Sequence, residues 1–238
     1  MKSHAARKQV ITLILCACVI YIGAGNAADQ KAKAFARTHP MDPYSMIEDG
    51  RSALKEGDLV VRMNRDPSSH FIKYFNHQDK SYSHSGIVLY QNGYPYVFHI
   101  VDGAENPDGK MRMDSLKLFC DPRKNDAFGI FRYEMNPAEI EKLKGIIHEW
   151  FTKAVRFDSR FDLKTDDRMY CSEMITKALA GATGKKILIR TTRLSAVEAS
   201  FLTAYSHLPF EYTNHLNIIP IDALYVNPFC HPVKKYRY

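Results

Sequence analysis

The stretch from His84 to Val101, HSGIVLYQNGYPYVFHIV, decides the fold of this chain. Its two halves are rich in branched and aromatic residues, which favour strands. Between them stands Asn92-Gly93, the strongest short signal of a hairpin turn. A turn at this place pairs residues whose numbers sum to about 185, so His84 and His99 come within a residue or two of facing each other. The stretch therefore predicts an antiparallel hairpin with two neighbouring histidines.

The rest of the chain adds strands first and helices later. Pro137 at a first helical position, preceded by Asn136 and followed by Glu139, marks the start of a long amphipathic helix. The expected elements are strands at 57–62 and 128–133, helices at 68–75, 136–154 and from 171 onward, an extended piece at 155–163, a helix at 192–204 and a buried segment at 218–224. Strands followed by helices favour an α+β fold with an antiparallel sheet.

Cys171 stands at the predicted start of a helix, in MYCSEMI, residues 169–175. The free N–H groups at a helix N-terminus lower the pKa of a thiol and can hold the oxyanion formed when its sulfur attacks a carbonyl. Such a cysteine needs an imidazole as base, and His84 is the best candidate. His99 would orient His84, while Ser172 and Glu173 would bond free N–H groups of the helix.

Three segments resemble the YiiX-like permuted papain-fold enzymes, a branch of the NlpC-type cysteine peptidases. They are Gly57 to Val60, Tyr82 to Val88 and Tyr170 to Glu173, and the resemblance extends over residues 56–184 with a continuation at 219–222. In this branch the strand with the histidine precedes the helix with the cysteine. The resemblance implies a circularly permuted papain-like fold in which the sheet packs against the cysteine helix.

The same resemblance assigns roles to individual residues. It implies that Cys171 is the nucleophile, that His84 is the base, and that His99 occupies the third position, where the family often has Glu. A histidine there also resembles the lecithin:retinol acyltransferase relatives. Asp158 falls in a segment that lines the family's cleft, and Tyr170 lies next to the thiol, so both are candidate substrate-binding residues. No cofactor is expected.

The N-terminus has the pattern of a secretory signal peptide. Lys2, Arg7 and Lys8 precede an apolar run at residues 10–22, and small residues follow up to Ala27. We expect a signal peptide at 1–27, a leader at 28–55 and one hydrolase domain at 56–238, with export to the periplasm or the exterior. A lipidated Cys18, or an uncleaved N-terminus, leaves membrane association open.

The charge and the cysteine content limit the possible partners and the possible disulfides. The net charge of +7 falls to +4 without the signal peptide, and no basic stripe interleaved with aromatic residues is present, so no nucleic-acid partner is expected. Three cysteines lie beyond the signal peptide. In an oxidising compartment Cys120 and Cys230 are candidates for a disulfide, with two separately buried thiols as the alternative.

The sequence thus predicts an exported thiol hydrolase that attacks an amide, of a peptide or peptidoglycan type, or an acyl carbonyl. Its substrate would be a small molecule, a peptide, or a cell-wall or lipid component. Two alternatives remain open. His84, His99 and Cys171 could form a metal site, or the same fold could serve as a catalytically silent binding module.

Overall fold

The computed structural model describes residues 41–104 and 106–238. The predicted signal peptide and residues 28–40 of the predicted leader lie outside this range. The folded unit begins at Pro43 rather than near residue 56, because helix α2 (Pro43–Ala53) packs against the sheet and buries Ile47. Within the described residues, no helix is both long and apolar enough to cross a membrane.

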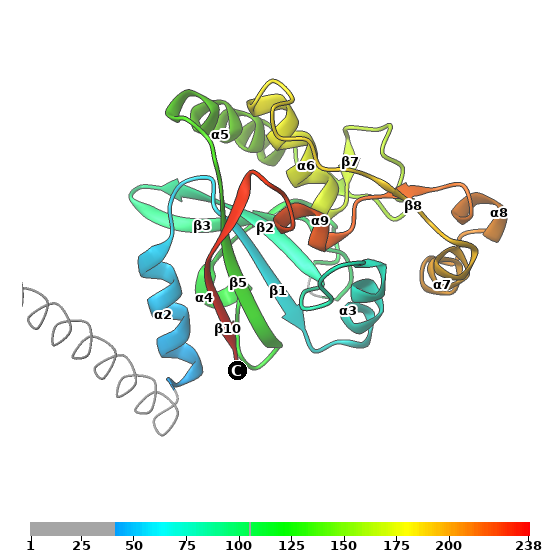
Figure 1. Cartoon of the computed structure of the whole chain (residues 1–238), viewed down its shortest axis with the longest axis horizontal. Helices are drawn as coiled ribbons and strands as arrows, with labels where there is room; N and C mark the ends of the chain where they lie inside the picture. Colours follow the sequence, from blue (N-terminus) through cyan, green and yellow to red (C-terminus); the bar gives the residue numbers. More distant parts are fainter. Residues whose placement is uncertain (1–40, 105) are drawn as a thin grey trace, which may run out of the picture. The chain divides into compact units, whose positions relative to one another are not determined.

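A six-stranded antiparallel sheet forms the centre of the molecule (Figure 1). Its strands follow the spatial order β10-β5-β1-β2-β3-β4. Their bounds are β1 Leu59–Asn64, β2 His84–Gln91, β3 Tyr94–His99, β4 Arg112–Ser115, β5 Asn125–Tyr133 and β10 Cys230–Arg237. Two short two-stranded pairings, β6 Arg156–Phe157 with β7 Arg168–Met169 and β8 Thr192–Arg193 with β9 Asn217–Ile218, lie outside it.

The predicted hairpin is confirmed in its register and its turn. Ile87 pairs with Phe98, so the sum of paired numbers is 185. Asn92 and Gly93 both have positive φ, 51° and 78°, as a two-residue hairpin turn requires.

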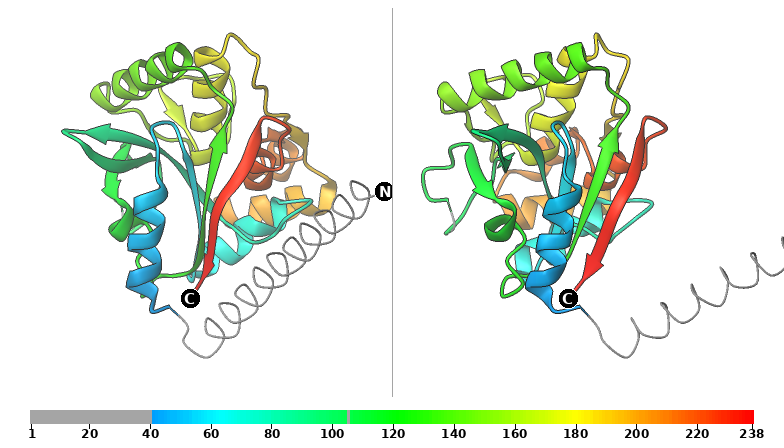
Figure 2. Two further views of the ribbon diagram at one scale, coloured as in Figure 1. Left: turned by 60° about the vertical axis from the view of Figure 1, so that its left-hand side comes forward. Right: turned by 90° about the vertical axis from the view of Figure 1, so that its left-hand side faces the viewer.

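Helices cover both faces of the sheet. The helices and helical turns are α3 Pro67–Ile72, η1 Lys73–Phe75, α4 Leu116–Phe119, α5 Pro137–Thr152, α6 Cys171–Ala182, α7 Ala196–Ser206, α8 Phe210–Thr213 and α9 Ile221–Tyr225. Side chains of α5 and α6 share one apolar core with Leu59 and Ile87, whereas α2 and α4 share another with Val60 and Val88. Figure 2 shows α2 (blue) running alongside the long strands of the sheet. Alternate side chains along β1 and β2 therefore point into two different cores, one on each face of the sheet. The predicted packing of the sheet against the cysteine helix is confirmed.

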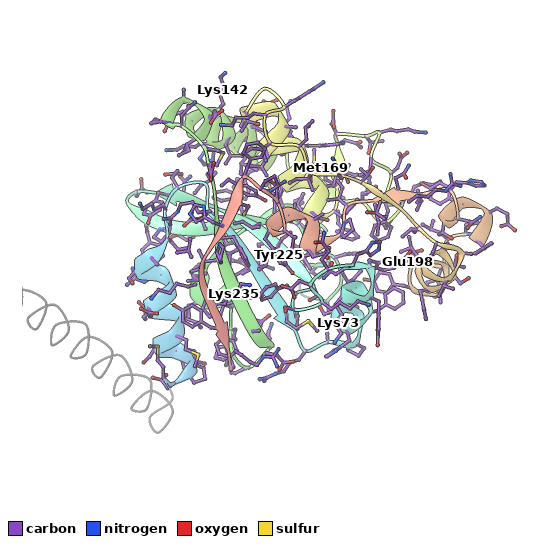
Figure 3. All side chains as sticks on the ribbon, in the orientation of Figure 1. Lys73, Lys142, Met169, Glu198, Tyr225 and Lys235 are labelled. Carbon is purple, nitrogen blue, oxygen red and sulfur yellow. The ribbon has the colours of Figure 1, made fainter. Side chains whose placement is uncertain are left out.

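Two strands of the six-stranded sheet escaped the sequence analysis. β10 contains Pro232 and three basic residues, a composition that suits the edge of a sheet rather than its centre. β4 is short and polar. By contrast, the long helix α5 begins as predicted, with Asn136 and Glu139 forming a reciprocal cap. Figure 3 shows the exposed Lys142 pointing away from α5, while Met169, just before α6, is fully buried.

Of the two alternatives for Cys120 and Cys230, the structure has the separate thiols, since both cysteines are free. Cys230 opens β10, whereas Tyr238, just past the other end of that strand, donates its hydroxyl to the Cys120 carbonyl at 2.5 Å. Eight residues of strand therefore separate the two cysteines, roughly 20 Å or more. A disulfide needs Cα atoms within about 7 Å.

Candidate active site

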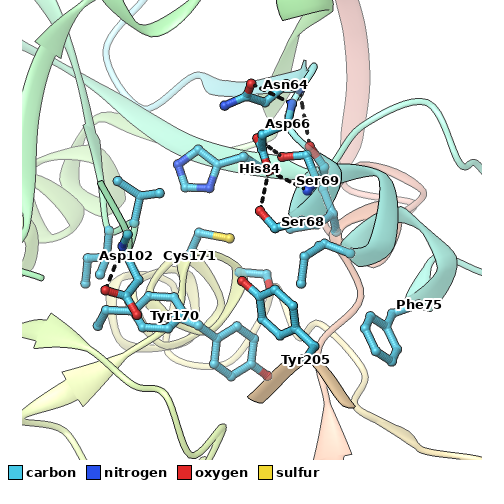
Figure 4. Close-up of a pocket in the computed structure, with 18 of the residues that line it drawn as sticks. Asn64, Asp66, Ser68, Ser69, Phe75, His84, Asp102, Tyr170, Cys171 and Tyr205 are labelled. Atoms are coloured by element: carbon cyan, nitrogen blue, oxygen red, sulfur yellow. Dashed lines mark hydrogen bonds between the residues drawn. The ribbon is translucent and has the colours of Figure 1, made fainter. Parts of the chain in front are cut away.

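A pocket of about 630 Å³ opens where β2 begins and α6 begins (Figure 4). Its wall contains both Cys171 and His84, the two residues that the sequence analysis chose as nucleophile and base. Neighbouring wall residues come from α3, α7 and the segment at 218–221. The size is typical of a site for a small organic ligand.

Cys171 is the first residue of α6 and is nearly buried. Burial raises the pKa of its thiol, against the opposing effects of the Ser85 hydroxyl and of the backbone N–H groups of Ser85 and Ser172. The expectation of a lowered thiol pKa is therefore wrong, because desolvation outweighs the helix N-terminus. The resting sulfur carries its proton, so an attack on a carbonyl requires a base that removes this proton.

His84 is the first residue of β2 and pairs with Arg62 of β1. Burial lowers the pKa of its imidazole well below the ordinary value, and the positive charge of Arg62 and the neighbouring His99 lower it further. The ring is consequently neutral at physiological pH and can accept a proton.

A chain of hydrogen bonds runs from His84 through His99 to Asp114. His84 Nε2 lies 3.0 Å from His99 Nδ1, and His99 Nε2 lies 3.1 Å from Asp114 Oδ2. Burial opposes ionisation of Asp114, yet its hydrogen bond to His99 and its ion pair with Arg112 hold the carboxyl pKa below the ordinary value. Burial lowers the pKa of His99, and the bond to Asp114 partly offsets this.

The ionised Asp114 determines the tautomers of both rings. A carboxylate can only accept, so His99 Nε2 carries its proton toward Asp114 and His99 Nδ1 becomes an acceptor. His84 Nε2–H then donates to that acceptor, and His84 Nδ1 keeps the free lone pair. Asp114 was missed by the sequence analysis because β4 was. Arg112 is the strand partner of His99, and Asp114 follows it by two residues. This spacing is the only sequence signal for the role of Asp114.

Alternation along β2 places Ser85, rather than His84, toward α6. Among the hydrogen bonds of residues 41–104 and 106–238, none joins the Cys171 thiol to His84. The buried Ser85 hydroxyl faces the sulfur without a well-formed bond to any described group. His84 nevertheless reaches the same pocket as the thiol, because it stands at the end of its strand where the pocket opens.

Gly86 makes the contact between the two histidines possible. A Cβ at this position would lie 2.4 Å from Val97 Cγ1 and 3.2 Å from His99 Cβ. Only glycine therefore allows β3 to bring His99 this close to β2.

The remaining predicted residues have different surroundings. Tyr170 lines the pocket, and its hydroxyl accepts from the Ile219 N–H at 2.9 Å. Ser172 donates to the Ile219 carbonyl at 2.7 Å instead of bonding a free helical N–H, whereas Glu173 accepts from the Tyr170 N–H as expected. Asp158 lies outside the pocket wall. Its carboxylate accepts N–H groups of its own turn, so the geometry supports a structural role for it.

The site does not have the shape of a metal centre. Within the described part of the chain, no three His, Cys, Asp or Glu side chains converge as metal ligands would. The nitrogens that His84 and His99 turn toward each other, and the one that His99 turns to Asp114, are already used in hydrogen bonds.

Comparisons with known proteins agree with this architecture. A family model described as "Permuted papain-like amidase enzyme, YaeF/YiiX, C92 family" matches residues 53–214. The "Uncharacterized protein YiiX" of Escherichia coli strain K12 is 27% identical over 174 residues, which cover 72% of this chain and 78% of that protein. A crystal structure described as metalloprotein YiiX from Escherichia coli O157:H7 superposes with a TM-score of 0.61 at 22% identity, covering 77% of this chain and 98% of that one.

Proposed function

The chain belongs to the C92 family of permuted papain-like amidases, and we propose that it is an exported thiol hydrolase that cleaves an amide through Cys171 and His84. The observation that carries the proposal is the meeting of two unlike elements at one pocket. The start of α6 brings a thiol with free N–H groups beside it, and the start of β2 brings a neutral imidazole with an oriented lone pair.

The proposed reaction begins when His84 Nδ1 takes the thiol proton while the sulfur of Cys171 attacks the amide carbon. The N–H groups of Cys171 and Ser172 at the start of α6 stabilise the oxyanion. His84 then returns the proton to the departing amine, and an acyl-thioester remains on the sulfur. Water, activated by the same imidazole, releases the carboxylic acid and restores the thiol. His99 and Asp114 hold His84 in the required tautomer throughout.

Two alternatives are weaker on this geometry. The YiiX structure is described as that of a metalloprotein, but the residues of this chain do not fit a metal, because His84 and His99 bond to each other and to Asp114. A catalytically silent binding module would keep the pocket without turnover. It would have no use for an oriented lone pair in the same pocket as a thiol.

The test uses acetyl and octanoyl 4-nitroanilides with the intact protein. We expect release of nitroaniline and an acyl adduct on Cys171 in the intact mass. Cys171→Ser should abolish both, whereas Cys120→Ser should retain them, because Cys120 is fully buried away from the pocket. Turnover that survives in Cys171→Ser would exclude the thiol mechanism, and a wild type without turnover or adduct on any acyl probe would favour the silent module.

Export is the second part of the proposal and rests on residues 1–27 alone. Protein recovered from its native host should begin near Ala28 by N-terminal sequencing. A diacylglycerol on Cys18 would replace cleavage by lipidation while keeping the export. Recovery of the unprocessed chain from the cytoplasm would contradict both.

A further inference from the structure

The hydroxyl group of Ser85 lacks a partner in the resting structure. Ser85 is fully buried, and its Oγ forms no well-formed hydrogen bond with any group in residues 41–104 and 106–238. Most buried hydroxyl groups are paired, because an unpaired one has lost its bonds to water without gaining others. Such a group calls for an explanation in terms of another state of the site.

The position of Ser85 on β2 determines where its side chain points. Side chains alternate along a strand, so Ser85 lies on the same face as Ile87 and Leu89. Both of these residues share an apolar core with Cys171, because α6 packs on this face of the sheet. The Ser85 hydroxyl therefore faces the sulfur of Cys171.

The backbone of Ser85 presents a second donor to the same sulfur. The ladder between β2 and β3 begins at the pair of Ile87 and Phe98, so the Ser85 N–H lies outside it. This N–H acts on the Cys171 thiol together with the hydroxyl. Two donors from one residue thus converge on the sulfur.

A thiol and a thiolate differ in what they accept from these donors. A protonated sulfur is a weak acceptor, whereas a thiolate carries a full negative charge. Hydrogen bonds to an ionised acceptor are roughly twice as strong as those between neutral groups. Burial keeps Cys171 protonated at rest, so the Ser85 hydroxyl gains its strong partner only when the proton leaves the sulfur. Interactions that form only along the reaction path accelerate the chemical step.

We propose that Ser85 is a further catalytic residue, whose hydroxyl donates a hydrogen bond to the sulfur of Cys171 as the thiol loses its proton. The proposal rests on the hydrolysis proposed above and deepens it. The thiol proton still passes to His84 Nδ1. Ser85 keeps its own proton throughout, so no covalent bond to Ser85 forms or breaks. His84 removes the proton, and Ser85 stabilises the negative charge that remains.

The other titratable groups around the sulfur keep one charge state near pH 8.5. The pKa of His84 on β2 is well below its ordinary value, so this ring is neutral. Burial raises the pKa of Tyr170, before α6, and of Tyr205, on α7, so both remain protonated. Burial raises the pKa of Glu173 to about 7, so this carboxyl is ionised. A change in thiol reactivity at this pH therefore reports on the donors of Ser85.

The experiment measures the rate at which iodoacetamide alkylates Cys171 in the intact protein at pH 8.5, with the adduct located by peptide mass mapping. Ser85→Ala keeps the backbone donor and removes only the hydroxyl. It should slow alkylation about threefold or more, since a thiol pKa higher by about one unit reduces the thiolate tenfold and the more basic sulfur recovers part of the loss. We expect kcat/KM for acetyl 4-nitroanilide to fall about tenfold or more.

The melting temperature and a matched control separate this role from a structural one. Ser85→Ala removes a hydroxyl that is unpaired at rest, so its melting temperature should equal or exceed that of the wild type. The control is Thr176→Val within α6, where the hydroxyl is likewise buried and unpaired among the described residues but lies outside the pocket wall. This variant should alkylate and turn over like the wild type. An equal loss in Thr176→Val, or a Ser85→Ala protein that melts well below the wild type, would overturn the inference.

Alkylation needs no amide substrate, so this inference and the hydrolase proposal can fail separately. If the wild type turns over no anilide while Ser85→Ala still slows the alkylation of Cys171, the hydrolysis fails and the donor role of Ser85 survives. If the wild type turns over and Ser85→Ala changes neither rate, the hydrolysis stands and the inference is wrong.

Discussion

At the scale of single residues, the site depends on which nitrogen of each ring carries a proton. Asp114 is connected to His84 by two hydrogen bonds that pass through His99. Its charge nevertheless determines that His84 Nδ1 is the basic atom. In serine proteases an aspartate fixes the tautomer of a single histidine in the same way. Replacing that aspartate with asparagine leaves the histidine in the wrong tautomer. In the present site the effect passes through a second imidazole. Asp114 is therefore a positioning residue.

We predict that Asp114→Asn lowers kcat/KM for octanoyl 4-nitroanilide about tenfold or more. The amide can offer its NH2 group to His99 Nε2, which reverses both tautomers and leaves His84 Nδ1 protonated and unable to accept a proton. The measurement is the pH profile of kcat/KM beside the melting temperature. Asp114→Glu should recover part of the activity. If Asp114→Asn loses activity only in proportion to its loss of stability, the residue merely supports the fold.

At the scale of elements, the β2–β3 hairpin holds His84, the proposed base, and the start of α6 holds Cys171, the proposed nucleophile. The hairpin can bring its two histidines into contact only because Gly86 leaves room at the crossing. The start of α6 is fixed separately, by the bonds of Tyr170 and Ser172 to Ile219. The two elements also pack directly against each other in one apolar core, so a shift of either one affects the other.

We predict that Gly86→Ala destabilises the fold by about 1–3 kcal/mol, the usual cost of overpacking a core. It should also reduce activity, because its Cβ pushes against Val97 and His99. Urea unfolding and anilide turnover measure the two effects. The control is Gly145→Ala within α5, where nothing lies within 4 Å of the new Cβ. That change should stabilise the helix by up to about 1 kcal/mol. A Gly86→Ala protein as stable and active as the wild type would contradict this account.

At the scale of the whole molecule, two buried neutral histidines connect folding to pH. The pKa values of His84 and His99 are lower in the folded protein than the ordinary value of about 6.5. Below pH 6.5 the unfolded chain therefore binds more protons than the folded one, and the free energy of unfolding falls as the pH falls. The full stability is present above that pH.

We predict a loss of up to about 1.4 kcal/mol per pH unit for each of the two histidines below pH 6.5. Urea unfolding at pH 7.5, 6.5 and 5.5 measures it. A His84→Asn/His99→Asn variant should show a smaller change in stability over the same interval. An identical pH dependence in the variant would assign the effect to other groups.

Local patterns predicted much of this structure, and long-range contacts explain what they missed. The Asn92-Gly93 turn determined the hairpin register, and thereby the neighbouring histidines, because both depend on a few adjacent residues. Asp114 could not be found in this way, since its partner belongs to another strand. The sign of the thiol pKa change depended on how deeply α6 packs, which Cys171 and its sequence neighbours do not encode.

The order of the elements along the chain has one more consequence. His84, His99 and Asp114 all belong to the continuous run β2–β3–β4, whereas Cys171 follows only after β5 and α5. A ribosome thus finishes the proton-accepting half of the site well before it makes the sulfur. During synthesis the nascent protein contains the proposed base with nothing to activate, and the proposed chemistry can begin only when α6 docks on a sheet whose histidine strands were made earlier.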